Sequence, residues 1–182
     1  MFSDLSRPWK SKAMTPDWKP FQVALPGNKA DLPRSLETLE GVGDRLRVAA
    51  FAEIQAREAF LWATSFFKEA SSELKQAWSQ LAIDENRHLQ WLLTRMKELQ
   101  IEINARKVSD QLWCSLYSCQ NTRAFSLYMA SAEERGRVAG MRFFEVLHPT
   151  DPVTARIFKT IAEEEVNHIR MARQFFDHSR YS

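Results

Sequence analysis

The sequence predicts an all-α protein, and three observations support this expectation. Helix-breaking residues are scarce beyond the N-terminal region, because the 182 residues include only five glycines and five of the seven prolines precede Leu36. From Leu46 onward, apolar residues recur every three or four positions, which is the period of an amphipathic helix. Residues typical of helix starts divide this region into segments of helical length. A chain of this size suits one domain with a sizeable core.

Residues 1–40 are expected to form an extended arm on a helical body that comprises residues 41–182. The arm carries five prolines, which disfavour helix at their own positions and at the preceding residues. Trp9, Trp18 and Phe21 lie between these prolines. Three large aromatic side chains argue against a fully disordered tail, so we expect the arm to lay them on the body.

The first two helices of the body are expected to be long and closely connected. The first should run from about Asp44 to Lys68. The second should begin after Ser71 or Ser72, since both are plausible N-cap residues, and should end near Leu99. The short connection makes these two helices neighbours in an αα-hairpin.

The third helix has a less distinct start. A cap at Ser109–Asp110 could open a helix that breaks near Asn121, and a second stretch should then continue to about Leu147. The passage from Leu99 to Arg123 is therefore the natural crossover between the two halves of the body.

The fourth helix has a clear start. Asp151 stands at the cap position, Pro152 occupies the first helical position, and helical periodicity continues to about Phe176. Two αα-hairpins joined by a long crossover are typical of a four-helix bundle.

One pattern of glutamate and histidine occurs twice in the chain. Two Glu-x-x-His sequences lie 80 residues apart, and each has a glutamate 32 residues upstream of its own glutamate. All six residues interrupt the apolar stripes of their helices, so we expect them to face the core. The six residues are Glu53, Glu85, His88, Glu133, Glu165 and His168.

Four core-facing carboxylates require compensation. Buried carboxylates cost several kcal/mol each unless they are paired, protonated or bound to metal. Two divalent cations would balance four carboxylates and leave the histidines neutral as ligands. An oxygen-rich set with two imidazoles suits iron or manganese better than structural zinc. The sequence therefore predicts a dinuclear metal site, and a cluster of buried charges that satisfy one another is the alternative.

An acidic residue precedes each motif glutamate. These residues are Asp84 and Glu164. Histidines that bind metal usually donate their other N–H to a carboxylate. We therefore expect Asp84 to face His168 and Glu164 to face His88, although both acids could also be merely exposed on the helix surface.

Four further residues near the six candidates have competing interpretations. Glu58 and Glu134 are the nearest rival ligands, but their positions on the helix point away from those of Glu53 and Glu133. Gly136 and Gly140 either open a pocket beside the third helix or, as is commoner, allow close helix packing.

The segments around these residues resemble the ferritin-like superfamily of di-iron carboxylate proteins. Residues 50–57 are similar to the rubrerythrin-type segment in which a glutamate precedes x-Gln-Ala. Residues 84–89 resemble the D-E-x-x-H motif of di-iron oxygenases. Together with Glu133-Glu134-Arg135-Gly136, the combination is most similar to a bacterial ferritin-like family of unknown function. The resemblance extends over residues 46–176.

The resemblance implies two ligand triads for two iron ions, with manganese or a mixed pair as the alternative. The triads are Glu53, Glu85 and His88 for one ion, and Glu133, Glu165 and His168 for the other. Glu85 and Glu165 are implied to bridge the two ions. The implied activity is that of an oxidoreductase of the oxygenase or hydroxylase type, which activates O2 or peroxide toward a small-molecule substrate. Because the chain lacks the C-x-x-C pairs of a rubredoxin module, it would need an external electron donor.

Other functions remain open on the sequence alone. Iron storage, a non-catalytic metal-binding bundle and, less favoured, a tRNA-modifying hydroxylase share this scaffold. A homodimer also remains open, because six tryptophans could supply contacts, although core packing is their commoner use.

The composition narrows the classes of partner. A net charge of +2 is too small to favour nucleic acid or an anionic membrane. No apolar run approaches the roughly 18 residues of a membrane helix. Cys114 and Cys119 are five positions apart, which does not suit a disulfide on one helix. Free thiols, and an N-terminus unlike a signal peptide, lead us to expect a cytoplasmic protein.

Overall fold

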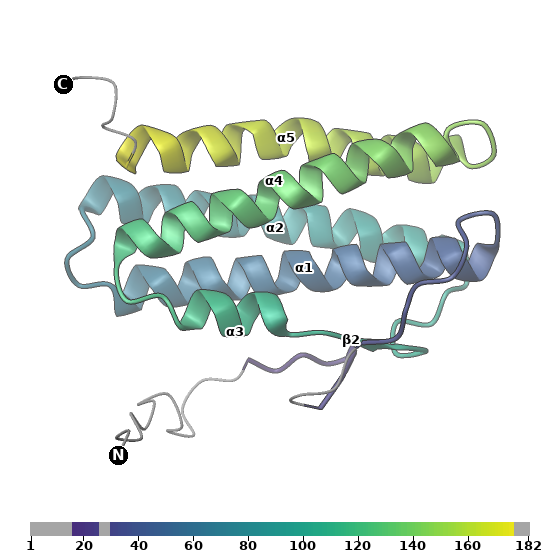
Figure 1. Ribbon diagram of the computed structural model, residues 1–182, viewed down its shortest axis with the longest axis horizontal. Coiled ribbons are helices and arrows are strands. Elements are labelled where there is room, and N and C mark those ends of the chain that lie inside the picture. The colour runs from purple at the N-terminus through teal and green to yellow at the C-terminus, as the bar shows by residue number, and fades with distance from the viewer. Residues whose placement is uncertain (1–15, 26–29, 177–182) are drawn as a thin grey trace, which may run out of the picture.

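The computed structural model of the protein describes residues 16–25 and 30–176 (Figure 1). Most of these residues are helical, which confirms the all-α expectation. Four of the helices are long, and one short helix lies between the second and third long helices in the sequence. The helices are α1 (Leu39–Phe66), α2 (Ser72–Glu98), α3 (Gln111–Tyr117), α4 (Thr122–Leu147) and α5 (Pro152–Phe176).

The long helices lie side by side as two pairs (Figure 1). Helix α1 packs mainly on α2, and α4 packs mainly on α5. The pairs meet where α2 contacts α5 and where α1 contacts α4. Helix α3 lies along α1 on the side away from α5 (Figure 1). The four long helices therefore surround one shared interior.

Capping side chains begin three of the long helices at the expected places. The Ser71 hydroxyl accepts a hydrogen bond from the backbone N–H of Leu74, at 3.2 Å, at the start of α2. The carboxamide oxygen of Asn121 accepts the N–H of Ala124 at 2.8 Å before α4. The Asp151 carboxylate accepts the N–H of Thr154 at 3.1 Å before α5. Each cap satisfies a backbone donor that the helix leaves unpaired.

The expected start of the first helix was wrong. Helix α1 begins five residues before Asp44, and its N-cap is Thr38, whose hydroxyl accepts the N–H of Gly41 at 3.0 Å. A Cβ atom at Gly41 would clash with the backbone carbonyl of Ser35, so the tight approach to the helix requires glycine here. Asp44 is a buried ion-pair partner within the helix, with Arg47 as one of its partners.

The described part of the N-terminal segment contacts the helices. Trp18 and Phe21 are both buried, and their rings lie 5.4 Å and 5.0 Å from the ring of Phe51 on α1. Trp9 lies outside the described residues. An unexpected feature is a short parallel pairing between β1 (Gln22–Val23) and β2 (Lys107–Val108). This pairing ties the N-terminal segment to the crossover between the helix pairs.

The two glycines of α4 behave differently. A Cβ atom at Gly140 would lie 3.3 Å from the backbone oxygen of Phe158 and 3.5 Å from the Cβ of Ala162. Gly140 therefore allows close packing of α4 on α5. Gly136 is exposed, and nothing lies within 4 Å of a Cβ atom placed there, so close helix packing does not explain this glycine.

Two further expectations concern the cysteines and membrane-spanning helices. Cys114 and Cys119 are both free thiols. Among the helices in the described ranges, none combines the length and the hydropathy that crossing a membrane would require.

Candidate metal centre

Six buried acidic and imidazole side chains converge in the shared interior of the long helices. Each long helix contributes to the cluster. The two Glu-x-x-His pairs come from α2 and α5, and their spacing of three residues places both side chains of a pair on one helix face. None of the six is more than 9% exposed. They are the residues expected from the sequence, namely Glu53, Glu85, His88, Glu133, Glu165 and His168.

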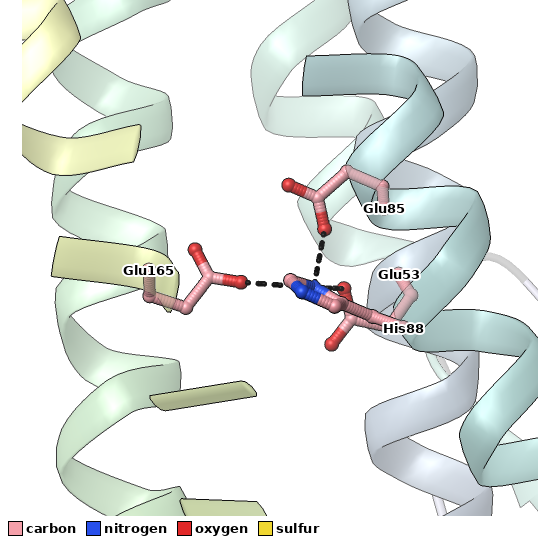
Figure 2. Close-up of side chains that lie close together, drawn as sticks. All are labelled: Glu53, Glu85, His88 and Glu165. Carbon is pink, nitrogen blue, oxygen red and sulfur yellow. Dashed lines mark ion pairs between the residues drawn. The ribbon is translucent and has the colours of Figure 1, made fainter. Parts of the chain in front are cut away.

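Both imidazole rings direct Nδ1 into the cluster. The Nδ1 atom of His168 lies 3.1 Å from one oxygen of Glu85 and 3.1 Å from one oxygen of Glu165. The Nδ1 atom of His88 lies 3.4 Å from the other oxygen of Glu165. Glu53 and the second oxygen of Glu85 are each 3.7 Å from this same nitrogen (Figure 2). Carboxylates from three helices thus approach one imidazole.

The cluster resolves into two overlapping groups that could each hold a metal ion. In each group, one ligand atom per residue lies within 4.8 Å of the others. The groups share Glu85 and Glu165, the two residues for which the resemblance implies a bridging role. One group adds Glu53 and His88, and the other adds Glu133 and His168.

The outer nitrogens of both imidazoles face the carboxylates expected from the sequence. The Nε2 atom of His88 lies 2.9 Å from Glu164, within hydrogen-bonding distance. The Nε2 atom of His168 lies 3.6 Å from Asp84, which is the longer and weaker contact. Arg87, which was not expected at the site, pairs with both Asp84, at 2.8 Å, and Glu164, at 2.6 Å. Arg87 therefore joins the two acids from α2 and α5.

The rival ligands lie outside the cluster. Glu58 pairs with Arg57 at 2.6 Å, and Glu134 pairs with Arg137 at 2.7 Å. Neither glutamate belongs to the two ligand groups found in the described part of the chain. The preference for Glu53 and Glu133, which rested on helical geometry, therefore agrees with the structure.

The protonation of the cluster reflects its burial and its crowded charges. Burial raises the pKa of Glu53 and Glu133 well above the ordinary value, and neighbouring carboxylates raise it further. Burial would lower the pKa of both imidazoles, but contacts with the glutamates outweigh it. They raise the pKa of His168 to about 11 and that of His88 as well. Without a metal, the cluster would retain protons that keep its net charge small.

Hydrogen bonding within the cluster is incomplete. The described residues contain eight buried side-chain nitrogen and oxygen atoms without a hydrogen-bond partner, and five of them belong to the cluster. Buried polar atoms are normally paired, so each exception requires an explanation. The five atoms are Glu85 Oε1, His88 Nδ1, Glu133 Oε1, Glu165 Oε2 and His168 Nδ1.

Comparison with known proteins places the chain in a family. The family is described as "protein of unknown function (DUF455)", and its model matches residues 5–181. The chain belongs to this family. No curated protein and no solved structure matched the chain. The family description assigns no activity, so the function of this chain has to be inferred from the geometry of the cluster.

Proposed function

We propose that the four long helices form a ferritin-like four-helix bundle that holds a dinuclear carboxylate metal centre, with two iron ions as the favoured pair. The observation that carries this proposal is the overlap of two buried ligand groups that share Glu85 and Glu165. Two ions held side by side can be bridged by carboxylates that reach both, and residues that belong to both groups are placed to do so. Two Glu-x-x-His pairs and two further glutamates from four helices are the ligand set of such centres.

The cluster fits this metal pair in three respects. Five of its buried nitrogen and oxygen atoms have no hydrogen-bond partner, and a cation would supply one. Its oxygen-rich donor set with two imidazoles suits iron or manganese. Two divalent ions would also balance four carboxylates, which otherwise repel one another in a low-dielectric interior.

Each residue has a distinct part in this proposal. Glu85 and Glu165 would span both ions, while Glu53 and Glu133 would each bind one. Glu164, within hydrogen-bonding distance of His88 Nε2, would fix the orientation of that ring. Asp84 faces His168 Nε2 at 3.6 Å, beyond hydrogen-bonding distance. The bound pair would supply redox chemistry toward O2 or peroxide, and an external donor would supply electrons. We therefore propose an oxidoreductase that acts on a small-molecule substrate.

The proposed activity can be tested with iron-loaded protein and a chemical reductant. Consumption of O2 or peroxide should depend on bound iron and should be lost in Glu165→Ala. Glu58→Ala is the matched control, because Glu58 pairs with Arg57 outside the cluster. Iron uptake that rises far beyond two ions per chain, with assembly into a large particle, would instead indicate storage.

The two outer carboxylates should contribute unequally to metal affinity. Glu164→Gln should weaken iron binding by about 10- to 100-fold, the usual effect of losing a partner of a metal-bound histidine. Asp84→Asn should weaken it less, because the distance from Asp84 to His168 is 3.6 Å whereas Glu164 lies 2.9 Å from His88. Equilibrium titration with a competing chelator measures both effects. Equal affinities for both variants and the unmodified protein would rule out this role.

Metal binding should release protons. Ligands bind metal in their deprotonated forms, whereas raised pKa values favour protons on Glu53, Glu133, His88 and His168 in the metal-free protein. Loading both positions should therefore release up to four protons per chain, and apparent affinity should increase with pH. Calorimetry in buffers of different ionisation enthalpy counts these protons. Metal binding without proton release would contradict the protonation described above.

A further inference from the structure

A narrow cavity adjoins one side of the cluster. Twelve residues from all four long helices line it, and nine of them are apolar. Of the six candidate ligands, only Glu133 and His168 are among its lining residues. The third polar lining residue is Ser126, which is buried. The cavity therefore borders residues of one of the two proposed metal positions.

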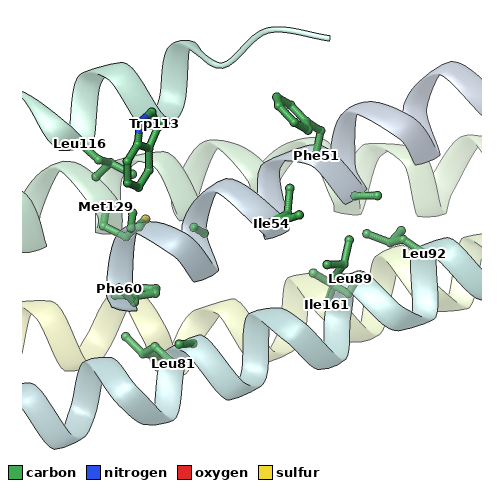
Figure 3. Close-up of a cluster of buried hydrophobic side chains, with 14 of the residues drawn as sticks. Phe51, Ile54, Phe60, Leu81, Leu89, Leu92, Trp113, Leu116, Met129 and Ile161 are labelled. Atoms are coloured by element: carbon green, nitrogen blue, oxygen red, sulfur yellow. The ribbon is translucent and has the colours of Figure 1, made fainter. Parts of the chain in front are cut away.

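The cavity extends toward the end of the molecule where α2 begins and α5 ends. Leu74 lines it from the first turn of α2, and Phe175 lines it from the last turn of α5. Phe60, Leu81 and Met129 line it between this end and the cluster, from three different helices (Figure 3). Ala172 and Phe175 are only half-buried, so they form the outer part of the cavity.

The opposite side of the cluster is covered. The ring of Trp91 lies 5.5 Å from the ring of His88. The guanidinium of Arg87 lies over Trp91 and pairs with Glu164, which in turn contacts His88. The two proposed metal positions therefore have different surroundings: an aromatic and ionic cover near His88, and an apolar cavity near His168.

Size and polarity limit what the cavity can hold. Its volume is about 10 Å³, far below the roughly 300–1,000 Å³ of pockets that bind organic ligands. An organic substrate would not fit without movement of the helices. In the metal-free protein the lining carries three buried atoms without a hydrogen-bond partner, on Ser126, Glu133 and His168, which could hold a water. With metal bound, Glu133 and His168 would be engaged as ligands. The nine apolar residues would then leave a mainly apolar cavity, and such cavities stay dry and take up apolar guests.

We propose that this cavity binds a small apolar molecule of the size of dioxygen and admits it to the cluster at Glu133 and His168. This inference rests on the proposed function, and it favours dioxygen over peroxide as the reactant. An organic substrate would then have to approach the cluster by another route.

Xenon is a suitable probe, because it detects apolar cavities without any turnover. Crystals of the iron-loaded protein under xenon pressure should show xenon beside Phe60 and Met129. Met129→Ala should increase its occupancy at least roughly twofold by enlarging the cavity. Met96→Ala is the matched control, since Met96 is equally buried but does not line the cavity. Ordered water between Ser126 and Glu133, with no xenon in either protein, would overturn the proposal.

A second variant tests access to the cluster. Ala172→Leu should narrow the outer part of the cavity and slow dioxygen consumption by the iron-loaded protein about tenfold, with iron content unchanged. Ala139→Leu, at a half-buried position of α4 away from the cavity, should not slow it. Unchanged consumption in Ala172→Leu would overturn the access route. A protein that binds no iron would instead contradict the proposed function on which this inference rests.

Discussion

Adding Fe(II) anaerobically to the metal-free protein should raise its melting temperature by about 5–11 °C. A ligand that binds only the folded state contributes about 2.7 kcal/mol when its free concentration is 100 times Kd. For a chain of this length, each kcal/mol shifts the melting temperature by about 2–4 °C. The folded protein brings the six ligands together, whereas the unfolded chain does not, so binding should favour the folded state.

Glu165→Ala should abolish this metal-induced rise. Glu165 belongs to both ligand groups, so its loss removes a donor from both positions. Glu58→Ala should keep the full rise, because Glu58 is engaged by Arg57 instead. Differential scanning calorimetry of the three proteins, with and without Fe(II), makes the comparison. Equal shifts in wild type and Glu165→Ala would show that the metal binds elsewhere.

Asp44→Ala should reduce the free energy of unfolding by about 3–5 kcal/mol, the usual effect of removing one partner of a buried ion pair. Asp44 and Arg47 are each 3% exposed, and their charged groups lie 3.1 Å apart. Without Asp44, the Arg47 guanidinium would remain buried with only the carbonyl oxygens of Glu102 and Ile103 as partners. The variant would thus leave an uncompensated charge between α1 and the crossover.

The same carboxylate should make stability depend on pH. Burial opposes ionisation of Asp44, but hydrogen bonds from Arg34 outweigh it and hold the pKa well below the usual range. A lowered pKa in the folded state contributes stability above the unfolded value of about 3.9. This contribution should decline as the pH falls below that value.

Urea denaturation between pH 7 and pH 3 measures both effects of Asp44. The wild type should lose stability with acid more steeply than Asp44→Ala, because the variant lacks the titrating group. Arg34→Met should cost far less stability than Asp44→Ala, because the arginine side chain is 42% exposed. It should also weaken the pH dependence, because the Arg34 side chain supplies hydrogen bonds that lower the pKa of Asp44. If the pH dependence of wild type and Asp44→Ala coincided, the buried ion pair would not be the source.

Local signals in the sequence predicted most of the helix boundaries. Ser71, Asn121 and Asp151 each cap a helix through a bond to a backbone N–H three residues later, so a short window contains the information. The start of α1 was missed because its cap, Thr38, lies in a stretch that the nearby prolines had assigned to the extended arm. The expected helix began at Asp44, a residue that pairs with Arg47 in the same helix and with Arg34 and Arg106 from other segments.

The cluster of glutamates and histidines could be predicted because its residues are physically costly where they lie. Glutamate and histidine on apolar helix faces, at matched spacing, indicate a shared interior site without knowledge of the packing. The position of Arg87 between Asp84 and Glu164 could not be predicted, since it depends on how α2 meets α5. The cavity beside His168 likewise depends on side-chain packing from four helices.

Metal content per chain is the most direct test of the proposed dinuclear centre. The protein should be expressed in iron-supplemented medium, purified aerobically and measured by mass spectrometry, with Glu85→Ala beside it. Glu85 belongs to both ligand groups. We expect about two iron ions per chain in the wild type and their loss in the variant. Little or no metal in the wild type, even after anaerobic reconstitution, would contradict the account and leave a cluster of buried charges that satisfy one another.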